Sequence, residues 1–251
     1  MAKFIKQVTV TGADDTTDIK TLLGITRAYP FVEFGILISQ KQQGNCRFPS
    51  MDWLMHLMEA SLPYRYGQPF NLNLSAHLCG AWLRQLCLGH TTIWDVSEPW
   101  LSVFKRVQLN FHGEPHRIDD SFYPVLLQGG KKQYIFQMDG VNNHLLAKAL
   151  YHRVNAVPFF DRSHGSGTLP DDWPKPILDL YCGYAGGLSP ENLAGQLDKM
   201  SFVVERRHIW IDAETHLRSN NDYHFDIDKV VRFVEIAKPY TLKSKAEALR
   251  R

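Results

Sequence analysis

Short apolar runs alternate with amphipathic stretches along the chain. The segment Phe31–Ser39, FVEFGILIS, is almost continuously apolar, which is typical of a strand buried on both faces of a sheet. Thr16–Tyr29 instead carries apolar residues at helical spacing, and Pro30 stops it. We therefore expect a strand followed by a helix to be the repeating unit of this fold.

The same pattern predicts eight strands and a helix after most of them. The predicted strands are Gln7–Gly12, Phe31–Ser39, Phe70–Leu78, Arg106–Gly113, Gln133–Gly140, Asn155–Asp161, one within Leu180–Leu197, and His208–Ala213. The clearest predicted helices are Thr16–Tyr29, Pro49–Ala60, Cys79–Gly89, Ile118–Gly130, Asn142–Arg153 and Asp226–Ala237. Little chain follows Asp161 before the next strand, so the sixth helix should be short or absent.

No two-residue hairpin turn joins neighbouring strands, so consecutive strands should run parallel, with right-handed crossovers. Eight such units suit the ~250 residues of a single (β/α)8 TIM barrel. A doubly wound open sheet is the alternative. We expect one domain over residues 1–251, with irregular insertions near 61–69 and 91–105.

The composition of the chain excludes some kinds of binding partner but does not indicate a reaction. The formal net charge of the 251 residues is +2, which gives no electrostatic basis for binding nucleic acid. The four cysteines form no CxxC pair, the N-terminal MAKFIKQVTV resembles no signal peptide, and no run approaches the ~18 apolar residues of a membrane span. We expect a cytoplasmic protein with a small-molecule ligand and no cofactor; the sequence leaves the oligomeric state open.

Active sites of (β/α)8 barrels lie at the C-terminal ends of the strands. Polar residues at these ends are Thr11, Glu33 or Ser39, His77, Asn110 and His112, Asp139, Asp161, and Asp212 with Glu214. Acid–base catalysis needs such groups within hydrogen-bond reach of one substrate. Two alternatives remain open: Asp139 precedes glycine and would suit a turn, and His77 would suit a structural role. A divalent metal held by His77, His112, Asp139 and Asp161 is a further alternative that spacing cannot test, and we assign no metal.

The segment GGLSPEN, Gly186–Asn192, is the clearest local motif. Ser189 suits a helix N-cap, and Pro190 suits the first helical turn. Gly186 and Gly187 precede this helix, where free backbone N–H groups and the helix dipole favour an anion. Phosphate sites in these barrels commonly use the loops after strands seven and eight. The motif therefore predicts a phosphate site, with a plain capped turn as the alternative.

Five blocks in order resemble phosphoribosylanthranilate isomerase, the barrel enzyme of tryptophan synthesis. They are FGILIS…RFPS (Phe34–Ser50), VQLNFHG (Val107–Gly113), FFDRSHGSGTLPDDW (Phe159–Trp173), AGGLSPENL (Ala185–Leu193) and IDAETH…FDIDKVVRFVE (Ile211–Glu235). The resemblance implies a phosphorylated, sugar-like substrate isomerised by acid–base catalysis. It also implies roles for particular residues.

Asp161 would be the general acid, with Asp139 or His77 as a replacement base. Arg47 would hold a substrate carboxylate, with Thr11, His112 and Asp212 beside the substrate. The phosphate would lie against the backbone of Gly186 and Gly187, with Gly165 and Gly167 in the neighbouring loop.

Two departures from the family pattern bear on the activity. The family's general base is a cysteine in a Lys-x-Cys-Gly motif, but the matching stretch here is TVTG, with Thr11 at the cysteine position. A threonine hydroxyl does not ionise near neutral pH as a thiol does. The family's Ser-Gly after strand eight is replaced near Glu214–His216. The alternatives to an isomerase are thus an inactive barrel that serves as a binding or assembly module, and a metal-dependent epimerase or aldolase-like barrel.

Overall fold

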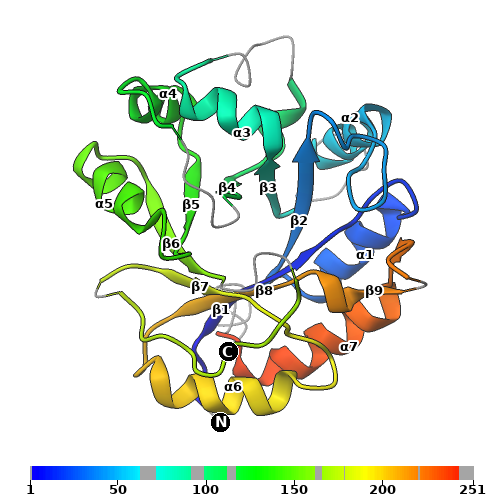
Figure 1. The fold of residues 1–251 in the computed structure, drawn as a ribbon. Coiled ribbons are helices and arrows are strands. Elements are labelled where there is room, and N and C mark those ends of the chain that lie inside the picture. Colours follow the sequence, from blue (N-terminus) through cyan, green and yellow to red (C-terminus); the bar gives the residue numbers. More distant parts are fainter. Residues whose placement is uncertain are drawn as a thin grey trace.

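The computed structural model describes residues 2–62, 72–91, 99–111, 117–161, 166–177, 179–219 and 221–242. Eight parallel strands close into a barrel in chain order, and helices lie outside the ring of strands (Figure 1). The strands are β1 (Ile5–Thr11), β2 (Val32–Ser39), β3 (Leu74–Cys79), β4 (Arg106–Leu109), β5 (Gln133–Gln137), β6 (Ala156–Phe160), β7 (Cys182–Tyr184) and β8 (Ile209–Ala213). The fold is a (β/α)8 barrel, as the sequence predicted.

Seven α-helices occur in the part of the chain that the structure describes. They are α1 (Ile19–Ala28), α2 (Met51–Ser61), α3 (Gly80–Cys87), α4 (Phe122–Gln128), α5 (Asn143–Tyr151), α6 (Leu193–Val203) and α7 (Ile227–Ala237). Short 3-10 helices are η2 (Pro99–Val103), η3 (Thr215–Leu217) and η4 (Lys238–Tyr240). Between β6 and β7 the described residues form no helix, in agreement with the prediction for the sixth unit. Of the insertions expected near 61–69 and 91–105, residues 63–69 and 92–98 lie outside the described residues.

Local sequence explains where several helices begin. The Ser50 hydroxyl accepts a hydrogen bond from the Trp53 N–H and caps α2, and the Asp226 carboxylate does the same for the Lys229 N–H at α7. Pro124 does not kink α4, because the helix begins at Phe122 and the proline lies in its first turn.

One small element was not predicted. Strands β9 (Arg218–Ser219) and β10 (His224–Phe225) form an antiparallel hairpin between β8 and α7. Asn221 and Asp222 in its turn adopt positive φ angles of 53° and 74°, a conformation that Asn and Asp tolerate better than most residues. The hairpin brings Arg218 and Asp222 to the rim of the barrel.

The barrel has an apolar outer layer and an interior in which charged and apolar side chains pack together. Residues such as Val10, Phe34 and Leu78 are fully buried between strands and helices. Inside the barrel, Arg106 Nη1 lies 2.9 Å from Glu33 Oε1. The Arg106 guanidinium also lies 4.1 Å from the centre of the Trp210 ring, a cation–π contact. A charged pair and an aromatic ring therefore fill part of the barrel interior. The part at the C-terminal ends of the strands is lined by the side chains of the strand ends.

Candidate functional site at the C-terminal end of the barrel

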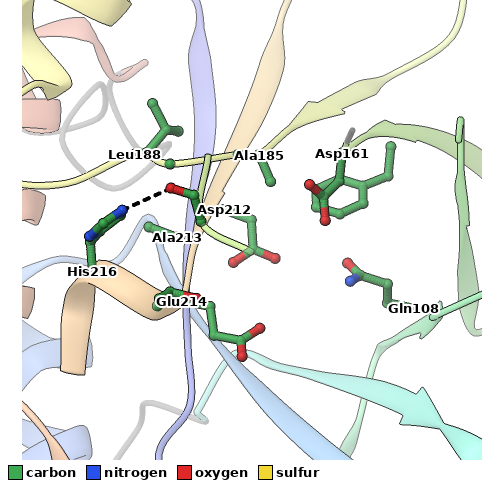
Figure 2. A pocket seen from close by; sticks show the side chains of 13 residues that line it. Gln108, Asp161, Ala185, Leu188, Asp212, Ala213, Glu214 and His216 are labelled. Atoms are coloured by element: carbon green, nitrogen blue, oxygen red, sulfur yellow. Dashed lines mark hydrogen bonds between the residues drawn. The ribbon is translucent and has the colours of Figure 1, made fainter. Parts of the chain in front are cut away.

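A cavity with about 420 Å³ of empty volume opens at the C-terminal ends of β6, β7 and β8. Its lining comprises Gln108, Phe159, Asp161, Gly167, Ala185, Gly186, Gly187, Leu188, Asp212, Ala213, Glu214, Thr215 and His216. Figure 2 shows the carboxyl groups of Asp161, Asp212 and Glu214 turned toward one space, with the Gln108 side chain across from them. The structure thus brings three carboxyl groups from two strand ends into one cavity.

Asp161 directly follows β6 and is only 8% exposed. The alternation of side chains along β6 buries Phe159 inside the barrel and places Asp161 on the same side, two residues further on. Phe159 stacks on Trp210 with their rings 8° from parallel, which fixes the floor beneath the carboxylate. The predicted general acid therefore lies in the cavity, at a rigid strand end.

The loop between β7 and α6 forms the opposite wall. Gly186 and Gly187 have φ angles of 118° and 61°, a region that favours glycine. A Cβ on Gly187 would lie 2.5 Å from the Leu169 backbone N and 2.8 Å from the Gly167 carbonyl O, so this loop contacts the loop after β6 through bare backbone. Within the described residues, the N–H groups of Gly186 and Gly187 donate no hydrogen bond. Both glycines line the cavity, and backbone donors without a partner beside a cavity are suited to an anion.

The rest of this loop is held by its own side chains. The Ser189 hydroxyl accepts a hydrogen bond from the Glu191 N–H at 3.2 Å, as a cap would. The Asn192 side-chain amide donates to the Gly187 carbonyl at 2.8 Å, and its oxygen accepts from the Ser189 N–H at 3.0 Å. The regular part of α6 begins only at Leu193, so its N-cap is Asn192 and not the predicted Ser189. The glycines are therefore held in place without using their N–H groups.

Asp212, near the end of β8, is the most enclosed carboxyl group of the cavity. The Thr11 hydroxyl donates a 2.8 Å hydrogen bond to Asp212 Oδ1, and His77 Nε2 lies 3.9 Å from Oδ2, beyond hydrogen-bond distance. Burial raises the pKa of Asp212 well above its ordinary value, and the Thr11 hydrogen bond opposes the rise. Three neighbouring carboxylates add to it: Glu214, Glu33 and Asp161.

His77 is a neutral imidazole in this setting. Burial lowers the pKa of His77 to about 3, and the positive charge of Arg106 contributes to the lowering. The His77 side chain does not line the cavity, and it lies behind the site, 3.9 Å from Asp212.

Glu214 and Arg47 form an ion pair at the rim. Arg47 Nη1 lies 2.7 Å from Glu214 Oε1, and Arg47 Nε donates to Asp222 in the β9–β10 turn. Burial raises the pKa of Glu214, and the charge of Arg47 opposes that rise. Arg218 continues the network by pairing with Asp14 at 2.7 Å. Arg47, predicted to hold a substrate carboxylate, is thus already bound to two carboxylates of the protein.

Other predicted site residues lie elsewhere or beyond the described chain. The Asp139 carboxylate accepts hydrogen bonds from the Asn142 backbone N–H at 2.8 Å and its side-chain amide at 2.9 Å, before α5. Asp139 does not line the cavity, and the turn interpretation of this residue accounts for these two hydrogen bonds. Gly167 lines the cavity, and its carbonyl contacts His216 Nε2 at 2.9 Å. His112 and Gly165 lie outside the described residues.

A second cavity, of about 960 Å³ empty volume, lies beside the first on the β2–β3 side. Lys41, Arg84 and Arg47 line it, and Glu214 lines both cavities. Sequence reasoning missed Gln108, Asp14 and Asp222 as parts of the site region. Gln108 had a detectable signal, because it lies two residues before Asn110 and faces the same side of β4. Asp222 had none, because the short hairpin that carries it was not predicted.

Among the described residues, no group of three or more His, Cys, Asp or Glu side chains is arranged to hold a metal ion. None of the described helices is long and apolar enough to span a membrane.

A closed ring of eight parallel strands, with its polar cavity at their C-terminal ends, defines the class of (β/α)8-barrel proteins. No protein-family profile matches the chain, and neither does any curated protein sequence. Solved structures do match it over nearly its whole length.

Phosphoribosylanthranilate isomerase from Thermus thermophilus matches with a TM-score of 0.58 at 13% identity, covering 93% of this chain and 98% of that one. The same enzyme from Thermotoga maritima matches with a TM-score of 0.54 at 15% identity, covering 95% and 100% of the two chains. A mutant tryptophan synthase α-subunit from Pyrococcus furiosus matches with a TM-score of 0.53 at 12% identity, covering 94% and 100%. These similarities confirm that the chain has a phosphoribosylanthranilate isomerase-like barrel fold. At such identities they establish the fold alone.

Proposed function

We propose that this protein is an acid–base isomerase of a phosphorylated, sugar-like small molecule. The observation that carries the proposal is the shared cavity of Asp161 and the Gly186–Gly187 loop. A carboxyl group for proton transfer thus faces the same space as backbone donors suited to a phosphate.

The roles follow from where the groups lie. An Amadori-type isomerisation moves protons between substrate atoms, so it needs an acid and a base within reach of one bound molecule. The phosphate would be held by the Gly186 and Gly187 N–H groups, which fixes the sugar over Asp161. Glu214 also lines this cavity and would repel that phosphate, but the Arg47 guanidinium lies 2.7 Å from Glu214 Oε1 and offsets its charge. The replacement of the family's Ser-Gly is therefore compatible with an anion at the glycine loop.

The first test is binding of inorganic phosphate, measured by calorimetry, followed by turnover of phosphoribosylanthranilate generated in situ, measured by its fluorescence decay. We expect phosphate to bind and the decay to accelerate, and Asp161→Asn to lose the acceleration. Asp172→Asn is the matched control, because Asp172 is an exposed acid in the same segment between β6 and β7. Full activity of Asp161→Asn would refute the role of Asp161.

A second candidate function is a binding module without catalysis. It is favoured by Arg47, whose two carboxylate partners leave it unavailable for a substrate carboxylate. This function predicts phosphate binding that persists in Asp161→Asn, together with no turnover by the wild type. Turnover by the wild type would exclude it.

A further inference from the structure

Three strands converge beside Asp212 because β2 contributes no side chain at that level. Gly35 pairs with Thr11 in the β1–β2 register. A Cβ on Gly35 would lie 2.1 Å from Thr11 Oγ1 and 2.9 Å from His77 Nε2. The missing side chain therefore leaves the space in which Thr11 and His77 approach the Asp212 carboxyl group.

Each contact to Asp212 acts on a different oxygen. Thr11 is fully buried and donates to Oδ1, which fixes the plane of the carboxyl group. His77, 1% exposed, lies nearest to Oδ2. Asp212 itself is 5% exposed and lines the cavity that holds Asp161 and the glycine loop. A carboxyl group held by one hydrogen bond and open to the cavity is arranged to exchange a proton with a bound molecule.

The titratable groups around Asp212 come from neighbouring strands and from the segments that follow them. Glu33 on β2, Asp161 after β6 and Glu214 after β8 are acidic, whereas His77 on β3 is neutral. Arg47 compensates Glu214, and Arg106 compensates Glu33. Burial raises the pKa of Asp212 and the acidic neighbours add to that rise, and a stronger base is a better acceptor of a carbon-bound proton.

We propose that Asp212 is the general base of this site, that Thr11 is its positioning residue, and that Asp212 acts in place of the thiol that the resembled family carries where this chain has Thr11. This assignment rests on the proposed isomerase function. The carbon-bound proton of the substrate passes to Asp212, and its electron pair forms a new carbon–carbon double bond while the carbon–oxygen bond of the sugar ring breaks. Asp161 gives a proton to the oxygen released from that bond. Transfer of a proton to carbon, with loss of the enol proton, completes the isomerisation, and exchange with solvent returns Asp161 and Asp212 to their starting protonation states.

The direct test needs no substrate. The protein is labelled with ¹³C at its aspartate carboxyl groups, and the Asp212 signal is assigned by its loss in Asp212→Asn. We expect this signal to titrate above the ordinary aspartate range. Thr11→Val should shift its midpoint further upward, because the hydrogen bond that favours the carboxylate is lost, and Thr11→Ser should restore it. A midpoint in the ordinary range, or one that Thr11→Val leaves unchanged, would overturn the assignment.

Inorganic phosphate then separates this assignment from the proposed function. Phosphate should bind and shift the Asp212 signal, because both occupy one cavity. Binding that leaves Asp212 unaffected would overturn the role of Asp212 while the anion site stands. Absence of phosphate binding would refute the proposed function, and the role of Asp212 as its base would fall with it.

Turnover provides the final readout. Asp212→Asn should lower kcat for phosphoribosylanthranilate by about 10²–10⁴-fold, the usual contribution of a general base. Thr11→Val should shift the pH profile of kcat, and Thr11→Ser should return it to the wild-type profile. A wild-type rate in Asp212→Asn would overturn the assignment. A wild-type protein that binds phosphate but does not turn over phosphoribosylanthranilate would count against the proposed isomerase function. The titration tests the basicity of Asp212 independently of turnover.

Discussion

Loss of the buried charge pair inside the barrel should destabilise the protein far more than loss of a surface pair. Arg106 and Glu33 lie 2.9 Å apart, with side chains 7% and 0% exposed. At an effective dielectric constant of ~20, two unit charges at this distance attract by about 6 kcal/mol. Much of that attraction offsets the cost of removing both charges from water, so the pair adds little net stability. Removing one partner, however, leaves the other charge buried and unpaired.

Arg106→Met should therefore lower the free energy of unfolding by about 3–5 kcal/mol. Glu33→Gln combined with Arg106→Met should recover most of this loss, because the double variant buries no charge. The glutamine also still accepts the hydrogen bond that the Thr9 hydroxyl gives to Glu33. The matched control is Arg232→Met, which breaks the exposed Arg232–Glu191 pair at 3.0 Å and should cost less than about 1 kcal/mol.

The assay is urea unfolding followed by circular dichroism and by tryptophan fluorescence, with stability taken from the midpoint and the slope. Coincident transitions from the two probes would confirm that one cooperative unit is being measured. The reasoning is refuted if Arg106→Met costs no more than Arg232→Met, or if the double variant is no more stable than Arg106→Met alone.

Three further predictions concern the site. Gly187→Ala should cost more stability than Gly130→Ala and should abolish phosphate binding in calorimetry. Both positions have φ near the left-handed region, 61° and 76°, but only at Gly187 would a Cβ meet backbone atoms. Equal losses of stability in the two variants would contradict this reasoning. Asp212→Asn should stabilise the protein at high pH but not near pH 4 in thermal unfolding. The raised pKa of Asp212 means that the folded state binds the proton more tightly than the unfolded chain does, so the stability contributed by protonated Asp212 is present at low pH and is lost as pH rises through the folded-state pKa. Each tenfold gain in proton affinity on folding corresponds to about 1.4 kcal/mol. A stability difference between wild type and Asp212→Asn that does not vary with pH would exclude the raised pKa. Asp139→Ala should cost about 1 kcal/mol through the turn before α5 and leave phosphate affinity unchanged, whereas a changed affinity would place Asp139 at the cavity after all.

The sequence predicted the barrel well because its signals were local and repeated. The apolar run of β2 and the caps at Ser50 and Asp226 depend on residues close together in the chain, and the structure agrees with them. Position at a strand end placed Asp161 and Gly186–Gly187 near one another, since parallel strands bring their C-terminal ends together.

The contacts within the site were harder to predict. The Thr11–Asp212 hydrogen bond joins residues 201 positions apart, and nothing in the pattern of either strand specifies it. Arg47 was assigned to a substrate carboxylate by the family resemblance, which does not specify its partners within this chain. One of them, Asp222, lies on a hairpin of two-residue strands, which is too short to leave a periodic signal. Asp139 followed the strand-end rule, but its side chain is used by the next helix start, which the rule does not consider.

The contact between the loops after β6 and β7 also has a consequence for how this protein can vary. The Gly187 position lies against the backbone of Leu169 and Gly167, with no side chain between them to absorb a change. An insertion or a bulkier residue in either loop would have to be matched in the other. Among relatives of this protein, the two loops should therefore keep their lengths together, and changes that alter specificity should accumulate on the β2–β3 side of the mouth, where no such constraint acts.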